Sequence, residues 1–190
     1  MARFVSAVAL TASMAILVSS GAQAGGSNYE RTYPARMIAV AVGARSFYVE
    51  FRARSEIGGV GHSYITLGTI VATGEVQESV VAGFMPKSAD DDYWAQFGIR
   101  VTGLVGVVRS DFSRRSADAR FRIAISRVQY RRAVEMIYRL QKTWAAYNFL
   151  TQNCNNFVAE IANSLDLRTP MITVQYPVDY IVELRSLNSP

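Results

Sequence analysis

The chain has one cysteine and one histidine, and each lies in a patterned segment. Cys154 follows Gln152 and Asn153 where an amphipathic helix is expected to begin. At a helix N-terminus, free backbone N–H groups and the helix dipole favour the nucleophilic thiolate over the thiol. His62 opens a strand-like segment after a glycine-rich connector, a rigid position for a general base. The two residues predict a cysteine hydrolase in which Cys154 attacks a carbonyl and His62 accepts and returns the thiol proton.

The remaining catalytic roles have less specific candidates. The Cys154 backbone N–H and the Gln152 amide are the expected donors to the oxyanion. The group that orients the imidazole stays open among four residues on the neighbouring strands: Gln77, Glu78, Glu50 and Tyr48. A tight turn at residues 73–74 would place Gln77 on the same sheet face as His62. The alternative for Cys154 is a small buried apolar side chain, but the amides on both sides of it suit a dry core badly.

Composition limits the other functions. A single cysteine and a single histidine cannot assemble a zinc site of the usual Cys/His type, and the triplet Asp90–Asp92 lacks the ligand spacing of a calcium loop. We therefore expect neither a metal nor a cofactor.

The formal net charge is +5, and no nucleic-acid-binding motif accompanies it. An arginine cluster predicts either an anionic surface partner or a solvated helix face, which we favour: Arg114, Arg115, Arg120, Arg122, Arg127, Arg131, Arg132 and Arg139.

The first residues have the pattern of a secretory signal. Arg3 precedes an apolar stretch over residues 4–18, and Ala22-Gln23-Ala24 matches a small-x-small cleavage site. We expect a signal peptide at 1–24, a flexible leader at 25–36 and one catalytic domain at 37–190. The protein is then periplasmic or secreted, and no later stretch is long and apolar enough to cross a membrane.

Hydrophobic periodicity predicts strands first and helices last. Alternating or β-branched segments indicate strands at 46–53, 62–71, 75–81, 99–108 and 121–125, with a loop at 84–98. Helical spacing, a Ser126 cap and a proline at a first helical position indicate helices at 127–144, 154–165 and 177–187. The expected fold class is α+β, with an antiparallel sheet packed against the helix that carries Cys154.

Two motifs resemble those of the circularly permuted papain-like cysteine hydrolases of the NlpC/P60-related superfamily. One is Gly61-His62-Ser63-Tyr64-Ile65, and the other runs from Tyr147 through Asn153-Cys154-Asn155-Asn156-Phe157. The resemblance implies a permuted papain-like fold in which Cys154 matches the nucleophile and His62 the base. It also implies a thiol protease, amidase or lipid acyltransferase, since such enzymes occur in these families.

The function expected from these observations is a periplasmic or secreted hydrolase that cleaves an amide bond. Peptidoglycan is the abundant amide polymer in that compartment, so a cell-wall peptide is the expected substrate. Two alternatives remain open. One is a lipid acyl hydrolase or acyltransferase, and the other is a catalytically silent binding module of the same fold.

Overall fold

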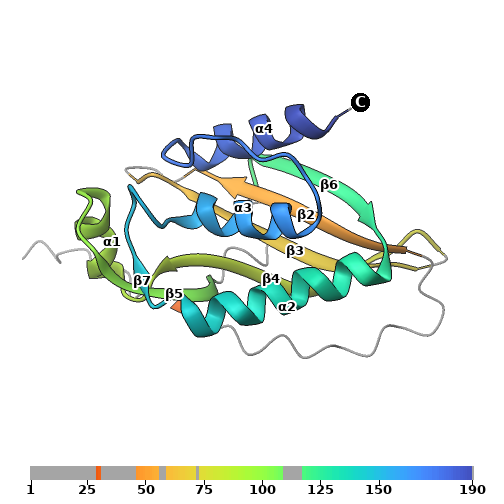
Figure 1. The fold of residues 1–190 in the computed structure, drawn as a ribbon, viewed down its shortest axis with the longest axis horizontal. Coiled ribbons are helices and arrows are strands. Elements are labelled where there is room, and N and C mark those ends of the chain that lie inside the picture. The colour runs from red at the N-terminus through yellow and green to blue at the C-terminus, as the bar shows by residue number, and fades with distance from the viewer. Residues whose placement is uncertain (1–28, 31–45, 56–58, 72, 109–116, 190) are drawn as a thin grey trace, which may run out of the picture.

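The computed structural model describes residues 29–30, 46–55, 59–71, 73–108 and 117–189 (Figure 1). The chain is α+β, with an antiparallel sheet and strands mostly before helices, which confirms the expected fold class at that level. The elements are β1 (Tyr29–Glu30), β2 (Ser46–Arg54), β3 (His62–Ile70), β4 (Val76–Pro86), α1 (Ala89–Gln96), β5 (Val101–Val108), β6 (Ala119–Ile125), α2 (Arg127–Thr143), β7 (Ala146–Tyr147), α3 (Cys154–Ser164) and α4 (Pro177–Asn188).

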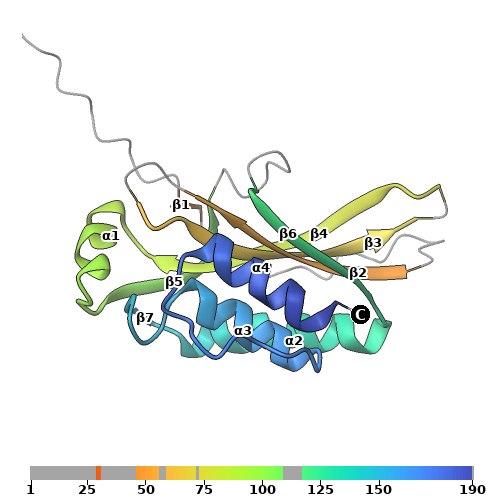
Figure 2. The same ribbon diagram turned by 90° about the horizontal axis from the view of Figure 1, so that it is seen from above.

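The sheet runs in the order β1-β5-β4-β3-β2-β6, and β7 pairs with β5. All of these pairings are antiparallel. Helices α2, α3 and α4 lie on one face of the sheet, and α1 lies at one end of it (Figure 2). The core includes Phe51, Ile65 and Phe121 from the sheet and Phe157 and Ile181 from the helices. Burial of these apolar side chains is the main force that holds the helices against the sheet.

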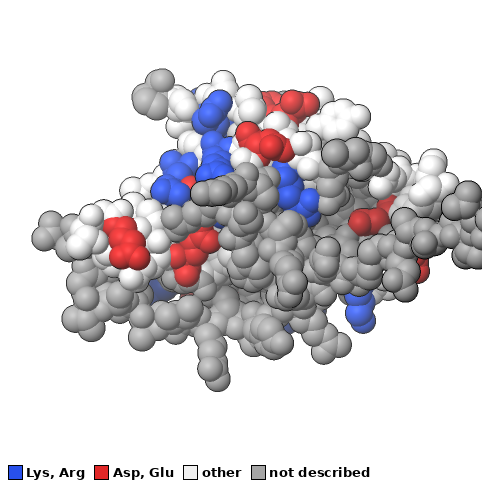
Figure 3. All heavy atoms as spheres, turned by 180° about the vertical axis from the view of Figure 1, so that it is seen from behind, with Lys and Arg blue, Asp and Glu red and all other residues white. Residues whose placement is uncertain are grey.

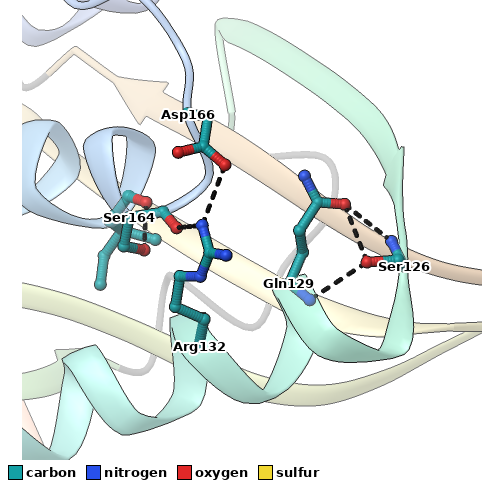
Figure 4. A network of polar contacts seen from close by, with 6 residues as sticks. Ser126, Gln129, Arg132, Ser164 and Asp166 are labelled. Atoms are coloured by element: carbon teal, nitrogen blue, oxygen red, sulfur yellow. Dashed lines mark hydrogen bonds and ion pairs between the residues drawn. The ribbon is translucent and has the colours of Figure 1, made fainter.

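Local capping explains where α2 and α3 begin. The Ser126 side chain accepts from the Gln129 backbone N–H, and the Gln129 amide oxygen accepts from the Ser126 N–H at 3.0 Å (Figure 4). This capping box satisfies backbone donors that have no partner inside the helix. Figure 4 also shows Arg132 of α2, which donates to Ser164 O and Asp166 Oδ2 and ties α2 to the end of α3.

Helix α1 replaces most of the loop expected at 84–98. The Ser88 side chain accepts from the Asp91 backbone N–H, and Asp90, Asp91 and Asp92 occupy the first turn. Carboxylates in a first turn are stabilised by the helix dipole, although aspartate has a low helix propensity in helix interiors. The acidic triplet therefore begins a helix, and the preceding strand β4 extends to Pro86.

The sheet face opposite the helices contains buried charges. Arg52 is fully buried and donates to Glu50 at 2.6 Å and to Glu78 at 2.5 Å. Arg122 pairs with the other carboxylate oxygen of Glu50. Because both Arg52 and Glu50 are removed from water, removal of one partner would leave an uncompensated buried charge.

The arginines expected to form a basic patch are partly neutralised by carboxylates. Arg122 pairs with Glu50, and Arg132 pairs with Asp166. On the face shown in Figure 3, basic and acidic side chains lie beside one another. Arg114 and Arg115 lie outside the described residues, as does nearly all of the expected signal peptide and leader; Tyr29 and Glu30 of the leader form β1.

Candidate active site

Cys154 is the first residue of α3 and is 4% exposed. Asn153 caps the helix, since its side-chain oxygen accepts from the backbone N–H groups of Asn155 at 2.9 Å and Asn156 at 3.1 Å. The Asn153 amide nitrogen donates to Phe149 O at 2.7 Å and Thr173 O at 3.3 Å. The cap therefore fixes the helix start to the chain on both sides of it.

Hydrogen-bond donors from three elements converge on the Cys154 sulfur. The hydroxyl and backbone N–H of Ser63 on β3, the Tyr147 hydroxyl on β7 and the Asn155 N–H on α3 all interact with it. The single Ser63 hydroxyl hydrogen has a second acceptor in Asn155 Oδ1, 2.8 Å from the hydroxyl oxygen, so it is donated to one of the two acceptors at a time. Tyr147 interacts with the Cys154 backbone as well as with its thiol, and the backbone interaction offsets part of the effect of burial on the pKa of Tyr147.

The thiol is nevertheless protonated at neutral pH in this resting state. Burial raises the pKa of Cys154 above its ordinary value of 9.0, and the hydrogen bonds from Ser63, Tyr147 and Asn155 offset only part of that effect. Burial, and then the negative charges of Asp92 and of Cys154 once it is ionised, raise the pKa of Tyr147 well above its ordinary value of 10.0. Tyr147 therefore keeps its proton and acts as a hydrogen-bond donor.

His62 lies on the other face of the sheet from the donors to the sulfur. Successive side chains along a strand point to opposite faces of the sheet, so His62 and Tyr64 lie on one face and Ser63 lies on the other. The rings of His62 and Tyr64 stack at a centroid distance of 5.8 Å. A Cβ added at Gly83 would lie 2.5 Å from His62 Nε2, so the imidazole covers that glycine. The structure brings Ser63, rather than His62, to Cys154.

Gln77 is distant from both residues. It is exposed and pairs with Thr69, seven residues along β3 from His62, which corresponds to about 23 Å at about 3.3 Å per residue. The pairing also places Gln77 on the face of Ser63 and Thr69. It therefore contacts neither the imidazole nor the thiol.

Gln152 is close to Cys154 in sequence, but its amide has other partners. With the amide oriented to satisfy both groups, its nitrogen donates to Ala146 O at 3.2 Å and its oxygen accepts from Trp144 Nε1 at 3.3 Å. Its backbone N–H donates to Asn148 O at 2.9 Å. These contacts hold the bend before α3, so Gln152 positions the helix start.

Two cavities lie near this end of the sheet, and Cys154 itself lines neither of them. A cavity of about 40 Å³ is lined by Tyr147, Asp92, Val60 and Phe149 among others, which is room for a water molecule. A larger cavity of about 280 Å³ shares Val60 and Phe149 with it and extends to residues 174–176. Tyr147 thus interacts with the sulfur and also lines the smaller cavity, which meets the larger one at Val60 and Phe149.

Ser63 and Tyr147 are the two residues near the sulfur for which the sequence predicted no role. Each had a visible signal: Ser63 adjoins the histidine, and Tyr147 is an aromatic hydroxyl in the bend before the cysteine.

Among the described residues, no group of histidine, cysteine or acidic side chains could hold a metal ion. Within the same ranges, every helix is too short or too polar to span a membrane.

A comparison with protein families found one matching model, the Lnb N-terminal periplasmic domain, over residues 107–186. The match covers 80 of the 190 residues and includes Cys154 and Tyr147 but neither His62 nor Ser63. It confirms the expected localisation, periplasmic or secreted. Comparisons with curated proteins and with solved structures found no match.

The resemblance to NlpC/P60-related, papain-like families is wrong, because the matching family model is a different one. That resemblance depended on two short motifs. In the fold, the histidine of the first motif does not face the cysteine of the second.

Proposed function

We propose that the protein is a thiol-dependent acyl hydrolase whose nucleophile is Cys154 and whose substrate is an amide bond in a cell-wall peptide. The proposal is supported mainly by the hydrogen-bond donors from β3, β7 and α3 that act on one buried sulfur and lower the pKa of its thiol. A cysteine that only fills a core needs no such donors. Hydrogen bonds that favour the thiolate are what a nucleophile requires at the moment of attack.

Tyr147 is the proposed proton carrier, because it interacts with the sulfur and lines the smaller cavity. As Sγ attacks the carbonyl carbon, the C–S bond forms and the carbonyl π electrons move to oxygen. The thiol proton passes to the Tyr147 oxygen while the Tyr147 proton passes to the leaving nitrogen. The electron pair on the oxyanion then re-forms the carbonyl as the C–N bond breaks and the amine leaves, which gives a thioester. Water then attacks the thioester carbon, the C–S bond breaks, and a proton returns to sulfur through Tyr147.

Periplasmic or secreted localisation supports a cell-wall peptide as the substrate. A direct test incubates wild-type protein and Cys154→Ala with peptidoglycan fragments and follows the products by mass spectrometry. We expect new carboxyl and amine termini with the wild type and none with Cys154→Ala. Glu135→Ala, at an exposed position on α2 that lines neither cavity, is the matched control for folding and handling. Identical product profiles for the wild type and Cys154→Ala would remove the hydrolase proposal.

A second candidate is an acyl group of a lipid, and one observation favours it. The larger cavity is bounded mainly by Val60, Phe149, Val174 and Tyr176, which suits an apolar substituent. The same mass spectrometric assay with diacyl phospholipids distinguishes the substrates, because the products would be lysolipid and fatty acid. Release of fatty acid without peptide cleavage would replace the cell-wall substrate.

The silent binding module is supported by the raised pKa of Cys154 and by the position of His62. It predicts that Cys154 reacts with electrophiles no faster than a cysteine in a short peptide. The hydrolase proposal predicts that an acylating substrate acylates Cys154 at a higher rate than it acylates the cysteine of the short peptide.

A further inference from the structure

Polar groups near Cys154 that could stabilise an oxyanion have other partners. The Asn155 N–H donates to Asn153 Oδ1 at 2.9 Å, and the Cys154 N–H interacts with the Tyr147 oxygen. The Gln152 amide is held between Trp144 and Ala146. A tetrahedral intermediate at the sulfur needs at least one donor that its own site has not already used.

Tyr180 supplies such a donor. It lies in α4, its side chain is fully buried, and its hydroxyl has no hydrogen-bond partner among the residues that the structure describes. The negative charge of a Cys154 thiolate contributes to the raised pKa of Tyr180, so the two groups lie within electrostatic range of each other. A buried hydroxyl without a partner costs folding free energy, so a sequence keeps one where it serves another purpose.

The start of α4 is fixed to the start of α3. The Asn155 side-chain nitrogen donates to Thr173 O at 2.9 Å and to Gln175 O at 3.0 Å, directly before α4 begins. Side chains in a helix slant toward its N-terminus, so Tyr180, in the first turn of α4, slants toward this junction. The junction also borders the larger cavity, which Gln175 and Tyr176 help to line.

We propose that Tyr180 is a catalytic residue whose O–H donates a hydrogen bond to the oxyanion formed when Cys154 attacks an acyl carbonyl. This inference rests on the proposed function. The C–S bond forms, the carbonyl π electrons move to oxygen, and the resulting negative charge accepts the Tyr180 hydrogen bond without taking the proton. Burial, and then the charges of Glu183 and Cys154, raise the pKa of Tyr180, so the hydroxyl remains a donor throughout the reaction.

Two reactions of the same sulfur test the proposal. Acetylation by p-nitrophenyl acetate passes through an oxyanion, whereas alkylation by iodoacetamide displaces iodide at a saturated carbon and forms none. Both adducts are followed at Cys154 by mass spectrometry of digested protein. For Tyr180→Phe we expect an acetylation rate about 100-fold below that of the wild type, because the donor is lost. The alkylation rate should stay within about twofold, and the melting temperature should equal or exceed that of the wild type, because an unsatisfied hydroxyl is removed.

The matched control is Tyr138→Phe, which removes a tyrosine hydroxyl from α2 and should leave both rates unchanged. Equal acetylation rates in Tyr180→Phe and wild type would overturn the role of Tyr180 while the hydrolase proposal stands. A parallel fall in both rates would assign Tyr180 to packing and would also overturn it. If wild-type Cys154 is acetylated no faster than a peptide cysteine, the hydrolase proposal fails, and this inference fails with it.

Discussion

Tyr147 and Cys154 interact directly: a hydrogen bond from the Tyr147 hydroxyl lowers the pKa of the Cys154 thiol, and Cys154 in turn helps to raise the pKa of Tyr147. The pair connects β7 at the end of the sheet to the first turn of α3. Because Tyr147 is buried and keeps its proton, it both orients the sulfur and stabilises negative charge on it. The reactivity of Cys154 should therefore respond to Tyr147 more than to the single histidine of the chain.

Replacement of Tyr147 by phenylalanine should raise the pKa of Cys154. The hydroxyl hydrogen bond favours the thiolate, and its loss should raise the pKa by about one unit, as expected for a hydrogen bond worth about 1 kcal/mol. The measurement is the pH dependence of the iodoacetamide alkylation rate. Tyr138→Phe is the control. A lower or unchanged pKa in Tyr147→Phe would show that the hydroxyl does not stabilise the thiolate.

Ser63 should affect the pKa of the Cys154 thiol, whereas His62 should not. Ser63→Ala removes a donor to the sulfur and should raise the pKa of Cys154 by about half a unit to one unit. His62→Ala acts on the other face of the sheet and should leave the alkylation profile unchanged. Ser63→Thr retains a hydroxyl, so its alkylation rate should depend on pH almost as the wild-type rate does. A larger effect from His62→Ala than from Ser63→Ala would refute this arrangement of the two side chains.

Of the two capping-box residues, Asn153 should be more costly to remove than Ser126. Ser126→Ala removes an exposed capping box and should lower the free energy of unfolding by about 1 kcal/mol. Asn153→Ala also removes amide donors to Phe149 and Thr173, so a loss of about 2 to 3 kcal/mol is expected. Urea unfolding at neutral pH measures both. Equal losses would mean that the two side-chain donations add nothing to the cap.

The stability of the protein should fall in alkaline solution partly because of Cys154. The thiol pKa is raised in the folded state, so the unfolded chain releases this proton first as the pH rises. The stability from this group is complete below the ordinary value of 9.0 and is lost as the pH rises toward the folded pKa. Urea unfolding under reducing conditions at pH 7 and pH 10 should show a larger loss for the wild type than for Cys154→Ala. An equal loss would contradict the raised thiol pKa.

The buried charge network on the far sheet face should be essential for stability. Glu50→Ala leaves Arg52 buried with only Glu78 as a carboxylate partner and should cost about 3 to 5 kcal/mol. Glu135→Ala, an exposed position on α2, should change stability by less than about 0.5 kcal/mol. Chemical denaturation compares the two. A small effect of Glu50→Ala would mean that solvent reaches Arg52.

Local signals in the sequence predicted α2, α3 and α4 almost to the residue. Their apolar periodicity and caps, such as Ser126 and the proline at position 177, are contained within each helix. Helix α1 was missed because its three aspartates disfavour a helix interior, and only the Ser88 cap and the helix dipole reveal that they form a first turn.

The site could be predicted only in part, because it depends on strand register. The sequence identified Cys154 and the segment that contains Ser63, but a shift of one residue along a strand exchanges the two faces. That difference separates Ser63, which contacts the sulfur, from His62, which stacks on Tyr64. Gln77 was similarly misplaced, because the hairpin joining β3 and β4 pairs it with Thr69.

The most direct test of the central claim compares acetylation of Cys154 in the folded wild-type protein and in the same protein unfolded in urea. Peptide mass spectrometry after brief exposure to p-nitrophenyl acetate at neutral pH gives both rates. A nucleophile supported by Ser63 and Tyr147 should be acetylated faster in the folded protein, despite its burial. Slower acetylation in the folded protein than in the unfolded chain would make Cys154 a packing residue and contradict the account.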